Sequence, residues 1–461
     1  MLQHRLIELA NGWPRFDPAP ERVAIPLLEY EKRLDRLRSA MAARRLSHLA
    51  IYGDREHCAN LLWTCGFDPR FEEALLIVSR EAAPLLLTGN ECSAYLPISP
   101  LWPAGLLRSE VYQPFSLLDQ PRASSRSLAE IFRAEGIEAQ SRIGCAGWKY
   151  YDHAHRMDLP SYIVDELRAT APDGSVEDAT GLFMNPRDGL RAICSAAEVA
   201  LFEEANWKAS EAMRRVVFAA REGMTDFEML AHAGYDGTPL SCHMTLKTGP
   251  KRTSLASPSG ARLERGHPWS ANVAYWGSNV CRANWVAASA SDLPESARDY
   301  VEAFAGPYFE AMGAWLAALR IGAPGGQLSS IVQNRLPFEK FGIFLNEGHL
   351  IHYDEWLSSP IYTGSEVPIR SGMVFQTDVI PSSKQYFSTR MEDGLAIADA
   401  ALREELRAQY PMVMARIDAR RTFARDVLGL PLADEHLPLS NTFGIVAPFL
   451  LRPNLVFALS P

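Results

Sequence analysis

The sequence predicts a two-domain α/β protein, and three observations carry that prediction. The chain has 461 residues, 47% hydrophobic and 22% charged, so it can bury a large core and is long enough for two domains. Helix-like and strand-like segments alternate through roughly the first 180 residues. Three short apolar runs after residue 348 carry a histidine and two carboxylates, which is typical of a polar site on neighbouring strands.

The first domain is expected over residues 1–180. Apolar residues at helical spacing predict helices, and short apolar runs bounded by turn residues predict strands. Turn clusters at Pro172–Ser175 and Asn185–Gly189 place the boundary near residue 180. The expected helices are 27–45 and 161–169, and the expected strands are 48–52, 74–78, 83–87 and 142–145.

The second domain is expected over residues 181–430, followed by a C-terminal extension, 431–461. A long amphipathic helix is predicted at 196–220, and the next helix is capped by Thr225 or Asp226, whose side chains suit the first free amides. Another helix is predicted at 400–425. The extension is apolar and rich in proline, and we expect it to pack on the domain or on a partner subunit.

Composition excludes several classes of function. The net charge of -9 is spread along the chain, so nothing suggests a basic surface for nucleic acid or an anionic membrane. No apolar leader or membrane-length apolar run is present, and we expect a cytoplasmic protein. The seven cysteines include no CxxC motif, which predicts reduced thiols without disulfides or a zinc knuckle.

The stretch from Gly348 to Gly394 carries the most chemistry. Gly348-His349, Gly372-Met-Val-Phe-x-x-Asp378 and Arg390-x-Glu392-Asp-Gly resemble the second half of the pita-bread family, which includes prolidase, proline aminopeptidase, methionine aminopeptidase and creatinase. The resemblance implies a creatinase-like N-terminal α/β domain and a C-terminal pita-bread α+β domain with a curved antiparallel sheet. It also implies that residues 60–67 form a strand and turn, and that the protein is a homodimer.

In the metallopeptidase members, the positions of His349, Asp378 and Glu392 bind a dinuclear metal centre together with two aspartates on a hairpin. Counting from Gly266 puts Asn272 at the first aspartate position, and Ser278-Asn279-x-x-Arg282 puts Asn279 at the second. An amide cannot bridge two hard cations as a carboxylate can. We therefore expect no dinuclear centre and no cofactor. A single Mn, Zn or Fe ion on His349, Asp378, Glu392 and Asn279 is the alternative.

Creatinase also lacks the two aspartates, but its catalytic histidine would fall here on Leu255 or Ala256. An acid or base must then come from elsewhere. A proton-transfer unit of His349 or His352 with Asp378 or Glu392 is one hypothesis. Arg282 and Arg390 could counter the two acids or clamp a substrate carboxylate. Other substrate-binding candidates are His243, Arg70, Asn272 and Asn279.

These observations leave three functions open. The first is a creatinase-like hydrolase or lyase that cleaves a C–N or similar bond in an amino-acid-like or guanidino-like small molecule. The second is a proline-specific metallopeptidase with one metal. The third is a catalytically inactive binding protein, in which the buried histidine, acids and arginines form only an ion-pair network.

Overall fold

The computed structural model describes residues 2–250 and 255–460. It divides into two compact units, each described here by itself. The smaller unit is Ile25–Ala192, and the larger unit combines the segment up to Ala24 with the segment from Ile193 onward. This division differs from the expected one, because the N-terminal segment belongs to the larger unit, the boundary falls at 192/193, and residues 431–460 are part of the larger unit.

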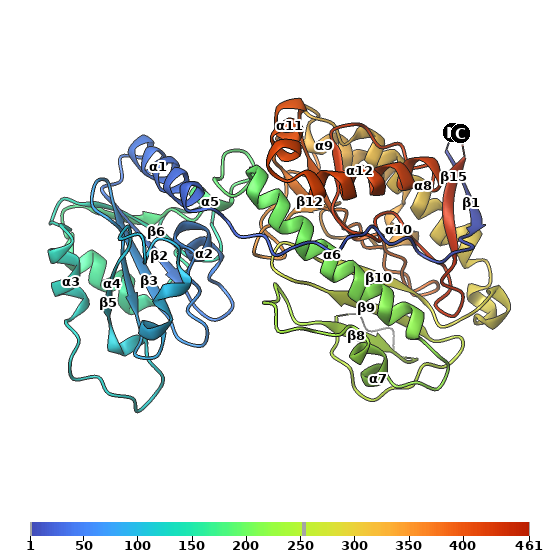
Figure 1. Ribbon diagram of the computed structural model, residues 1–461, viewed down its shortest axis with the longest axis horizontal. Helices are drawn as coiled ribbons and strands as arrows, with labels where there is room; N and C mark the ends of the chain where they lie inside the picture. The colour runs from blue at the N-terminus through green and yellow to red at the C-terminus, as the bar shows by residue number, and fades with distance from the viewer. Residues whose placement is uncertain (1, 251–254, 461) are drawn as a thin grey trace. The chain divides into compact units, whose positions relative to one another are not determined.

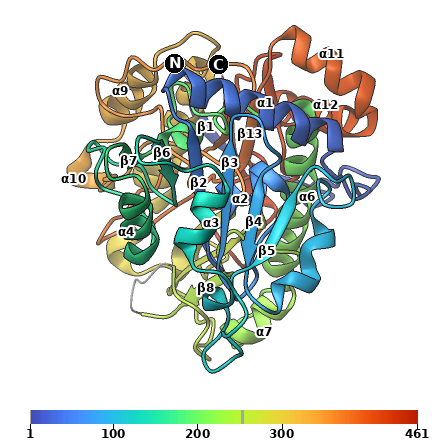
Figure 2. The ribbon, with the colours of Figure 1, turned by 90° about the vertical axis from the view of Figure 1, so that its left-hand side faces the viewer.

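The smaller unit is a six-stranded mixed sheet with helices, in the strand order β5-β4-β3-β2-β6-β7 (Figures 1 and 2). Strands β2, β3 and β4 are buried along almost their whole length, as expected for a sheet covered on both faces. Its strands are β2 (His48–Gly53), β3 (Ala74–Ser79), β4 (Leu85–Thr88), β5 (Arg108–Val111), β6 (Arg142–Ala146) and β7 (Ser175–Asp178). Its α-helices are α1 (Leu27–Ala43), α2 (Ala59–Cys65), α3 (Leu128–Ala134), α4 (Ser161–Thr170) and α5 (Gly181–Met184).

Every helix and strand predicted in this unit is present, but the strand and turn expected at 60–67 is wrong. These residues form helix α2 instead. The helix ends at Gly66, whose φ of 70° is the left-handed conformation that a glycine C-cap adopts. The same glycine that suggests a turn after a strand therefore closes a helix.

The larger unit begins its helical part with α6 (Ala196–Ala219), which confirms the long predicted helix. Ser195 and Glu198 form a capping box at its start, and Thr225 and Glu228 form another at the start of α7 (Asp226–Ala231). The helix predicted at 400–425 is in fact two helices, α11 (Ala400–Gln409) and α12 (Pro411–Asp426). Pro411 has no amide hydrogen to continue the first helix, so the second starts there.

Three antiparallel sheets complete the larger unit (Figure 1). Strands β8 (Thr245–Thr248), β9 (Pro268–Val273) and β10 (Val280–Trp285) form the first sheet. Strands β11 (His349–Leu350), β12 (Val374–Gln376), β13 (Gly394–Ile397) and β14 (His436–Pro438) form the second. The remaining helices are α8 (Gly306–Ala318), preceded by a π-helical turn at Val301–Ala305, α9 (Gly325–Arg335) and α10 (Phe338–Phe341).

The third sheet joins the two ends of the chain. Strand β1 (Gln3–Glu8) pairs antiparallel with β15 (Leu455–Ser460), in register from Gln3 opposite Ser460 to Glu8 opposite Leu455. The apolar extension therefore packs on its own domain. The pairing of β1 with β15 also places the N-terminal segment in the larger unit.

The two sheets that carry the predicted site residues meet at one backbone bridge. The amide of Cys281, on β10, donates to the carbonyl oxygen of Glu392, just before β13, at 3.2 Å. Asn272 lies opposite Cys281 on the neighbouring strand β9. This bridge brings the asparagine hairpin next to the second acid.

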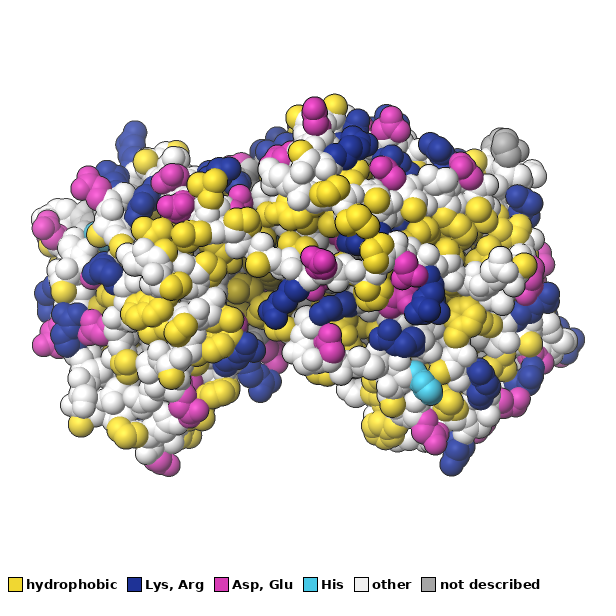
Figure 3. Space-filling view, viewed as in Figure 1, with side chains coloured by type: hydrophobic (Ala, Val, Ile, Leu, Met, Phe, Trp, Pro, Cys, Tyr) yellow, Lys and Arg dark blue, Asp and Glu magenta, His cyan; other side chains and the backbone are white. Residues whose placement is uncertain are grey.

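None of the helices in the described part of the chain combines the length and apolarity that a bilayer crossing requires. On the face seen in Figure 3, basic and acidic side chains are interspersed over each unit.

Candidate functional site

His349 is completely buried on β11 and its ring is held in a defined orientation. Its Nδ1 hydrogen-bonds with the backbone carbonyl of Leu350 at 3.2 Å. The ring stacks on the indole of Trp356, with centroids 4.1 Å apart and planes 18° apart. The second ring nitrogen, Nε2, is left to face the acids.

Two carboxylates lie at ion-pair distance from that nitrogen. The Oε1 atom of Glu355 is 3.5 Å from Nε2 of His349, and the Oδ2 atom of Asp378 is 3.7 Å from it. Asp378 is buried just beyond β12, whereas the Glu355 side chain remains 26% exposed. A carboxylate beside an imidazole can fix the orientation of the ring.

Asp378 and Glu392 form a pair of buried acids that interact with each other. Burial raises the pKa of Asp378, although His349 opposes the shift. Burial, followed by the negative charge of Asp378, raises the pKa of Glu392 well above its ordinary value. Two acids so close cannot both ionise easily, so the pair retains a proton above the usual carboxyl range.

A chain of hydrogen bonds runs from β8 to this pair through both asparagines. The hydroxyl of Thr245 donates to Oδ1 of Asn272 at 2.7 Å, and Nδ2 of Asn272 donates to Oδ1 of Asn279 at 3.0 Å. Nδ2 of Asn279 then donates to Oε1 of Glu392 at 2.6 Å. Nδ2 of Asn272 also lies 3.3 Å from Sγ of Cys242.

This donor set does not fit a dinuclear metal centre. Asn279 presents an N–H group to Glu392, and its Oδ1 atom is already an acceptor. Hard divalent cations need anionic oxygens that bridge them, which an amide donor cannot supply. The question of a single ion is separate. Among the described residues, one group of three possible metal ligands has all its ligand atoms within 4.8 Å of one another: Cys194, Glu198 and His352. None of these belongs to the expected single-ion set of His349, Asp378, Glu392 and Asn279.

Arg390 is the basic residue of the site. It is buried, and its Nη1 atom donates to Sγ of Cys281 at 3.0 Å. Burial works to lower the pKa of Arg390, but Cys281 and Glu392 outweigh it and raise the value, so the guanidinium stays charged. Its Nε atom is buried without a hydrogen-bond partner among the described residues, as are Nε2 of His349 and Oδ1 of Asp378.

Arg282, unlike Arg390, links β10 to other segments of the larger unit by hydrogen bonds. Its carboxylate partner is Asp393, at 2.7 Å, and not Asp378 or Glu392 as the sequence suggested. Its other hydrogen bonds go to the backbone carbonyls of Cys281, Glu392, Thr442 and Ile445. Its donors are thus engaged within the fold.

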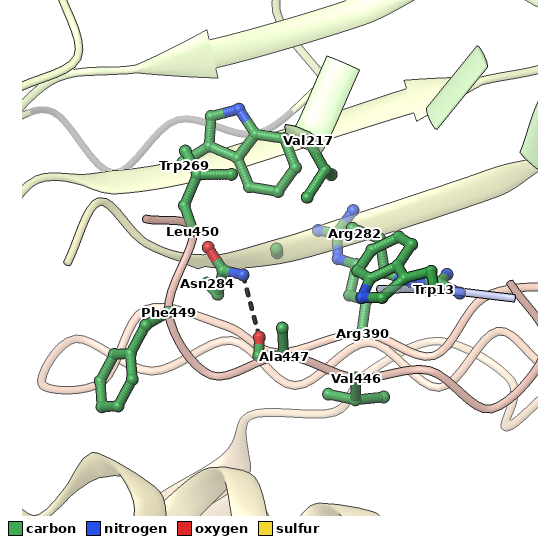
Figure 4. A pocket seen from close by; sticks show the side chains of 11 residues that line it. Trp13, Val217, Trp269, Arg282, Asn284, Arg390, Val446, Ala447, Phe449 and Leu450 are labelled. Atoms are coloured by element: carbon green, nitrogen blue, oxygen red, sulfur yellow. Dashed lines mark hydrogen bonds between the residues drawn. The ribbon is translucent and has the colours of Figure 1, made fainter. Parts of the chain in front are cut away.

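Arg282 and Arg390 also line a small cavity beside the site (Figure 4). The cavity has a volume of about 10 Å³, roughly the space of one water molecule. Trp13 and Ala447 contribute to its wall, and Asn284 donates to the carbonyl of Ala447 at 2.9 Å. A cavity of this size is too small for a substrate.

His352 does not join His349 at the two acids, which corrects one version of the proton-transfer hypothesis. Its Nε2 atom lies 3.1 Å from Oε1 of Glu198, in the first turn of α6. The ring makes edge contacts with Phe202 and Tyr353. The strand containing His349 ends one residue after it, so the chain turns and carries His352 to a different place.

His243 and Arg70 are the two remaining candidates. His243 precedes β8 and is exposed. Arg70 belongs to the smaller unit, where it pairs with Asp68 at 3.3 Å and lies over the ring of Tyr95. A substrate-binding role for either one stays a prediction.

Sequence reasoning missed four residues of the cluster. Glu355 and Trp356 follow β11, and the sequence was equally consistent with a solvated turn there. Thr245 reaches Asn272 from the neighbouring strand β8, and Cys242 reaches it from the segment before β8. No sequence motif marks these contacts, because they join segments that are distant in the sequence or lie in irregular structure.

The comparisons with known proteins agree with this architecture. No family model and no curated protein sequence matches the chain. Solved structures do match. The prolidase from Thermococcus sibiricus superposes with a TM-score of 0.63 at 14% identity, covering 90% of this chain and 97% of the prolidase. The Xaa-Pro dipeptidase from Bacillus anthracis gives 0.61 at 14% identity, covering 81% and 96%.

A structure of another kind matches equally well. The N-terminal domain of the FACT complex subunit SPT16 from chickpea, Cicer arietinum, superposes with a TM-score of 0.59 at 15% identity, covering 81% of this chain and 95% of that domain. The fold therefore occurs in peptidases and in a subunit of a complex. The chain has the two-domain pita-bread fold of the prolidases, at 14% sequence identity to these two.

Proposed function

We propose that this protein is a creatinase-like small-molecule enzyme, which hydrolyses a C–N or similar bond in an amino-acid-like or guanidino-like substrate without a dinuclear metal centre. The single observation that carries the proposal is the set of three buried polar atoms without hydrogen-bond partners among the described residues: His349 Nε2, Asp378 Oδ1 and Arg390 Nε. Buried polar groups are almost always paired, so exceptions gathered around one histidine favour a ligand site.

The groups supply complementary roles. Arg390 is a buried cation with a free N–H, which suits the carboxylate of an amino-acid-like substrate. His349 is oriented by Trp356 and flanked by Glu355, which suits a general base that takes a proton from water. The Asp378–Glu392 pair retains a proton, which suits a general acid.

These roles give a balanced hydrolysis. Water loses a proton to Nε2 of His349 as its oxygen forms a bond to the substrate carbon. The C–N bond breaks, and the leaving nitrogen takes a proton from the Asp378–Glu392 pair. The proton on His349 then returns to the acid pair through solvent, which restores the starting state.

The experiment is a turnover assay with chelator-treated protein. Guanidino acids, N-substituted amino acids and Xaa-Pro dipeptides are each tested for amine or amino-acid release, with EDTA and with added Mn²⁺. We expect turnover of a non-peptide substrate that EDTA leaves unchanged. The His349→Asn variant should lose about a hundredfold to ten-thousandfold in kcat, which is typical for a general base, while keeping its circular dichroism spectrum. Dipeptide cleavage only with Mn²⁺ would instead support a peptidase with one metal ion.

A binding role is the second candidate, and a specific observation favours it. The series of hydrogen bonds from Thr245 through Asn272 and Asn279 to Glu392 pairs both asparagine side chains without any ligand. The matching SPT16 domain is named as part of a complex. If no substrate in the panel is turned over and His349→Asn changes no measurable property other than local stability, the enzyme proposal fails and the binding role stands.

A further inference from the structure

A second cluster of metal-binding side chains lies at the start of helix α6, and nothing in the proposed function uses it. Cys194 immediately precedes the N-cap residue, Glu198 lies in the first turn, and His352 comes from the segment after β11. Their ligand atoms, one from each residue, all lie within 4.8 Å of one another. We propose that Cys194, Glu198 and His352 form a binding site for a single zinc-class divalent cation, separate from the His349 cluster.

The donor chemistry fits zinc. Zinc in proteins is bound by cysteine sulfur, histidine nitrogen and carboxylate oxygen, at about 2.0–2.3 Å. Ligand atoms around a tetrahedral zinc are then roughly 3.3–3.8 Å apart, so shifts of about 1 Å or less would close the present site. A thiolate and a carboxylate neutralise the two positive charges, and water takes the fourth position.

Hydrogen bonds position the Cys194 backbone and the Glu198 side chain at this site. The amide of Cys194 donates to the carbonyl of Gly372 at 2.8 Å. Oε2 of Glu198 accepts a hydrogen bond from the amide of Ser195 at 2.8 Å, and Oε1 lies 3.1 Å from Nε2 of His352. Support of a ligand by a second contact is what metal sites require, because it fixes the orientation before binding.

Burial also favours the site. Cys194, Glu198 and His352 are 5%, 1% and 0% exposed. A divalent cation would offset the cost of keeping an acid in this environment. It would also link the start of α6 to the segment that follows β11, so we expect metal binding to stabilise the larger unit.

The test is metal analysis and Co²⁺ substitution of the full chain, purified with reductant and without chelator. We expect one equivalent of zinc per chain, and, after exchange, a thiolate-to-cobalt charge-transfer band. Cys194→Ser should abolish the band. Glu198→Gln is the sharper variant, because glutamine can still serve the capping box but is not an anionic ligand. It should weaken zinc binding at least tenfold with its helix content intact.

Controls separate this site from the His349 cluster. Cys242→Ser, Cys281→Ser and Asp378→Asn should leave both the zinc content and the cobalt band unchanged. Zinc should raise the melting temperature of the wild type but not of Glu198→Gln, a measurement that needs no spectroscopic band. Absence of zinc and of any cobalt band would overturn the proposal, and so would a band lost in Cys281→Ser but kept in Cys194→Ser.

Discussion

Asn279 donates a hydrogen bond of 2.6 Å from its amide nitrogen to Oε1 of Glu392. In the metallopeptidases that the sequence resembles, an aspartate would stand at the position of Asn279 and the two carboxylates would face a cation. Here the N–H group of the amide takes the place of that cation as the partner of the acid. The first prediction tests this exchange.

Replacing both asparagines by aspartate should create metal affinity. The double variant Asn272→Asp/Asn279→Asp brings the carboxylates at the five ligand positions from two to four, which the oxygen-loving divalent cations require. We expect Mn²⁺ binding by titration calorimetry to appear at the His349 cluster only in the double variant. Without metal this variant should be less stable by about 3–5 kcal/mol, because it buries unpaired charge. Asn272→Asp alone is the matched control, and unchanged Mn²⁺ binding in the double variant would contradict the interpretation.

The acid pair should make stability depend on pH. The folded pKa of Glu392 is raised, so the folded state holds a proton that the unfolded chain releases near its ordinary pKa of 4.5. This contribution is complete below that value and is lost as pH rises through the raised folded pKa. The free energy of unfolding, measured by urea titration from pH 5 to 8, should therefore fall with pH more steeply in the wild type than in Glu392→Gln. Parallel curves would show that the pair does not retain its proton.

Arg282 and Arg390 should respond differently to substitution. Arg282→Met removes the partner of the fully buried Asp393 and should destabilise the protein by about 3–5 kcal/mol in chemical denaturation. Arg452→Met, which breaks an exposed pair with Glu8, should change stability by less than about 1 kcal/mol.

The Arg390→Lys variant tests the proposed role of Arg390 in substrate binding. Lysine keeps the charge but loses the planar fork, so substrate binding should weaken while folding is preserved. For a substrate found in the turnover assay, we expect KM to rise more than kcat falls. An equal loss of stability in Arg390→Lys and Arg282→Met would assign Arg390 to the structural network instead.

Strand β15 should be essential for the stability of the larger unit. Truncation after Asn454 removes the partner of every residue of β1, together with buried side chains such as Val456 and Phe457. Differential scanning calorimetry should show a lower melting temperature for the larger unit, while the transition of residues 25–192 is unchanged. Truncation after Ala458 is a milder comparison, because most of the ladder remains.

The positions of three candidate residues on or beside strands could be predicted, because each residue is tied to a local pattern. His349, Asp378 and Glu392 follow or precede short apolar runs bounded by glycine, and these runs became β11, β12 and β13. Asn272 was found by counting along the hairpin and Asn279 by its place in Ser278-Asn279-x-x-Arg282. Asn279 contacts Glu392 directly, and Asn272 contacts Asn279.

The rest depended on contacts between distant segments. Arg282 finds its partners partly in the last twenty residues, at Thr442 and Ile445, which no local pattern indicates. His352 is only three residues from His349, yet its partner Glu198 is 154 residues away. The amphipathic pattern at 400–425 continued across Pro411, because both helices that it contains pack an apolar face on the same domain.

The pairing of β1 with β15 has a consequence for synthesis on the ribosome. The larger unit contains both β1 and β15, so it cannot complete their sheet until residues 455–460 have been synthesised. Residues 25–192 lie wholly between those strands and can fold while the rest of the chain is still emerging. Until then β1 lacks the strand with which it pairs, and an unpaired strand edge favours aggregation.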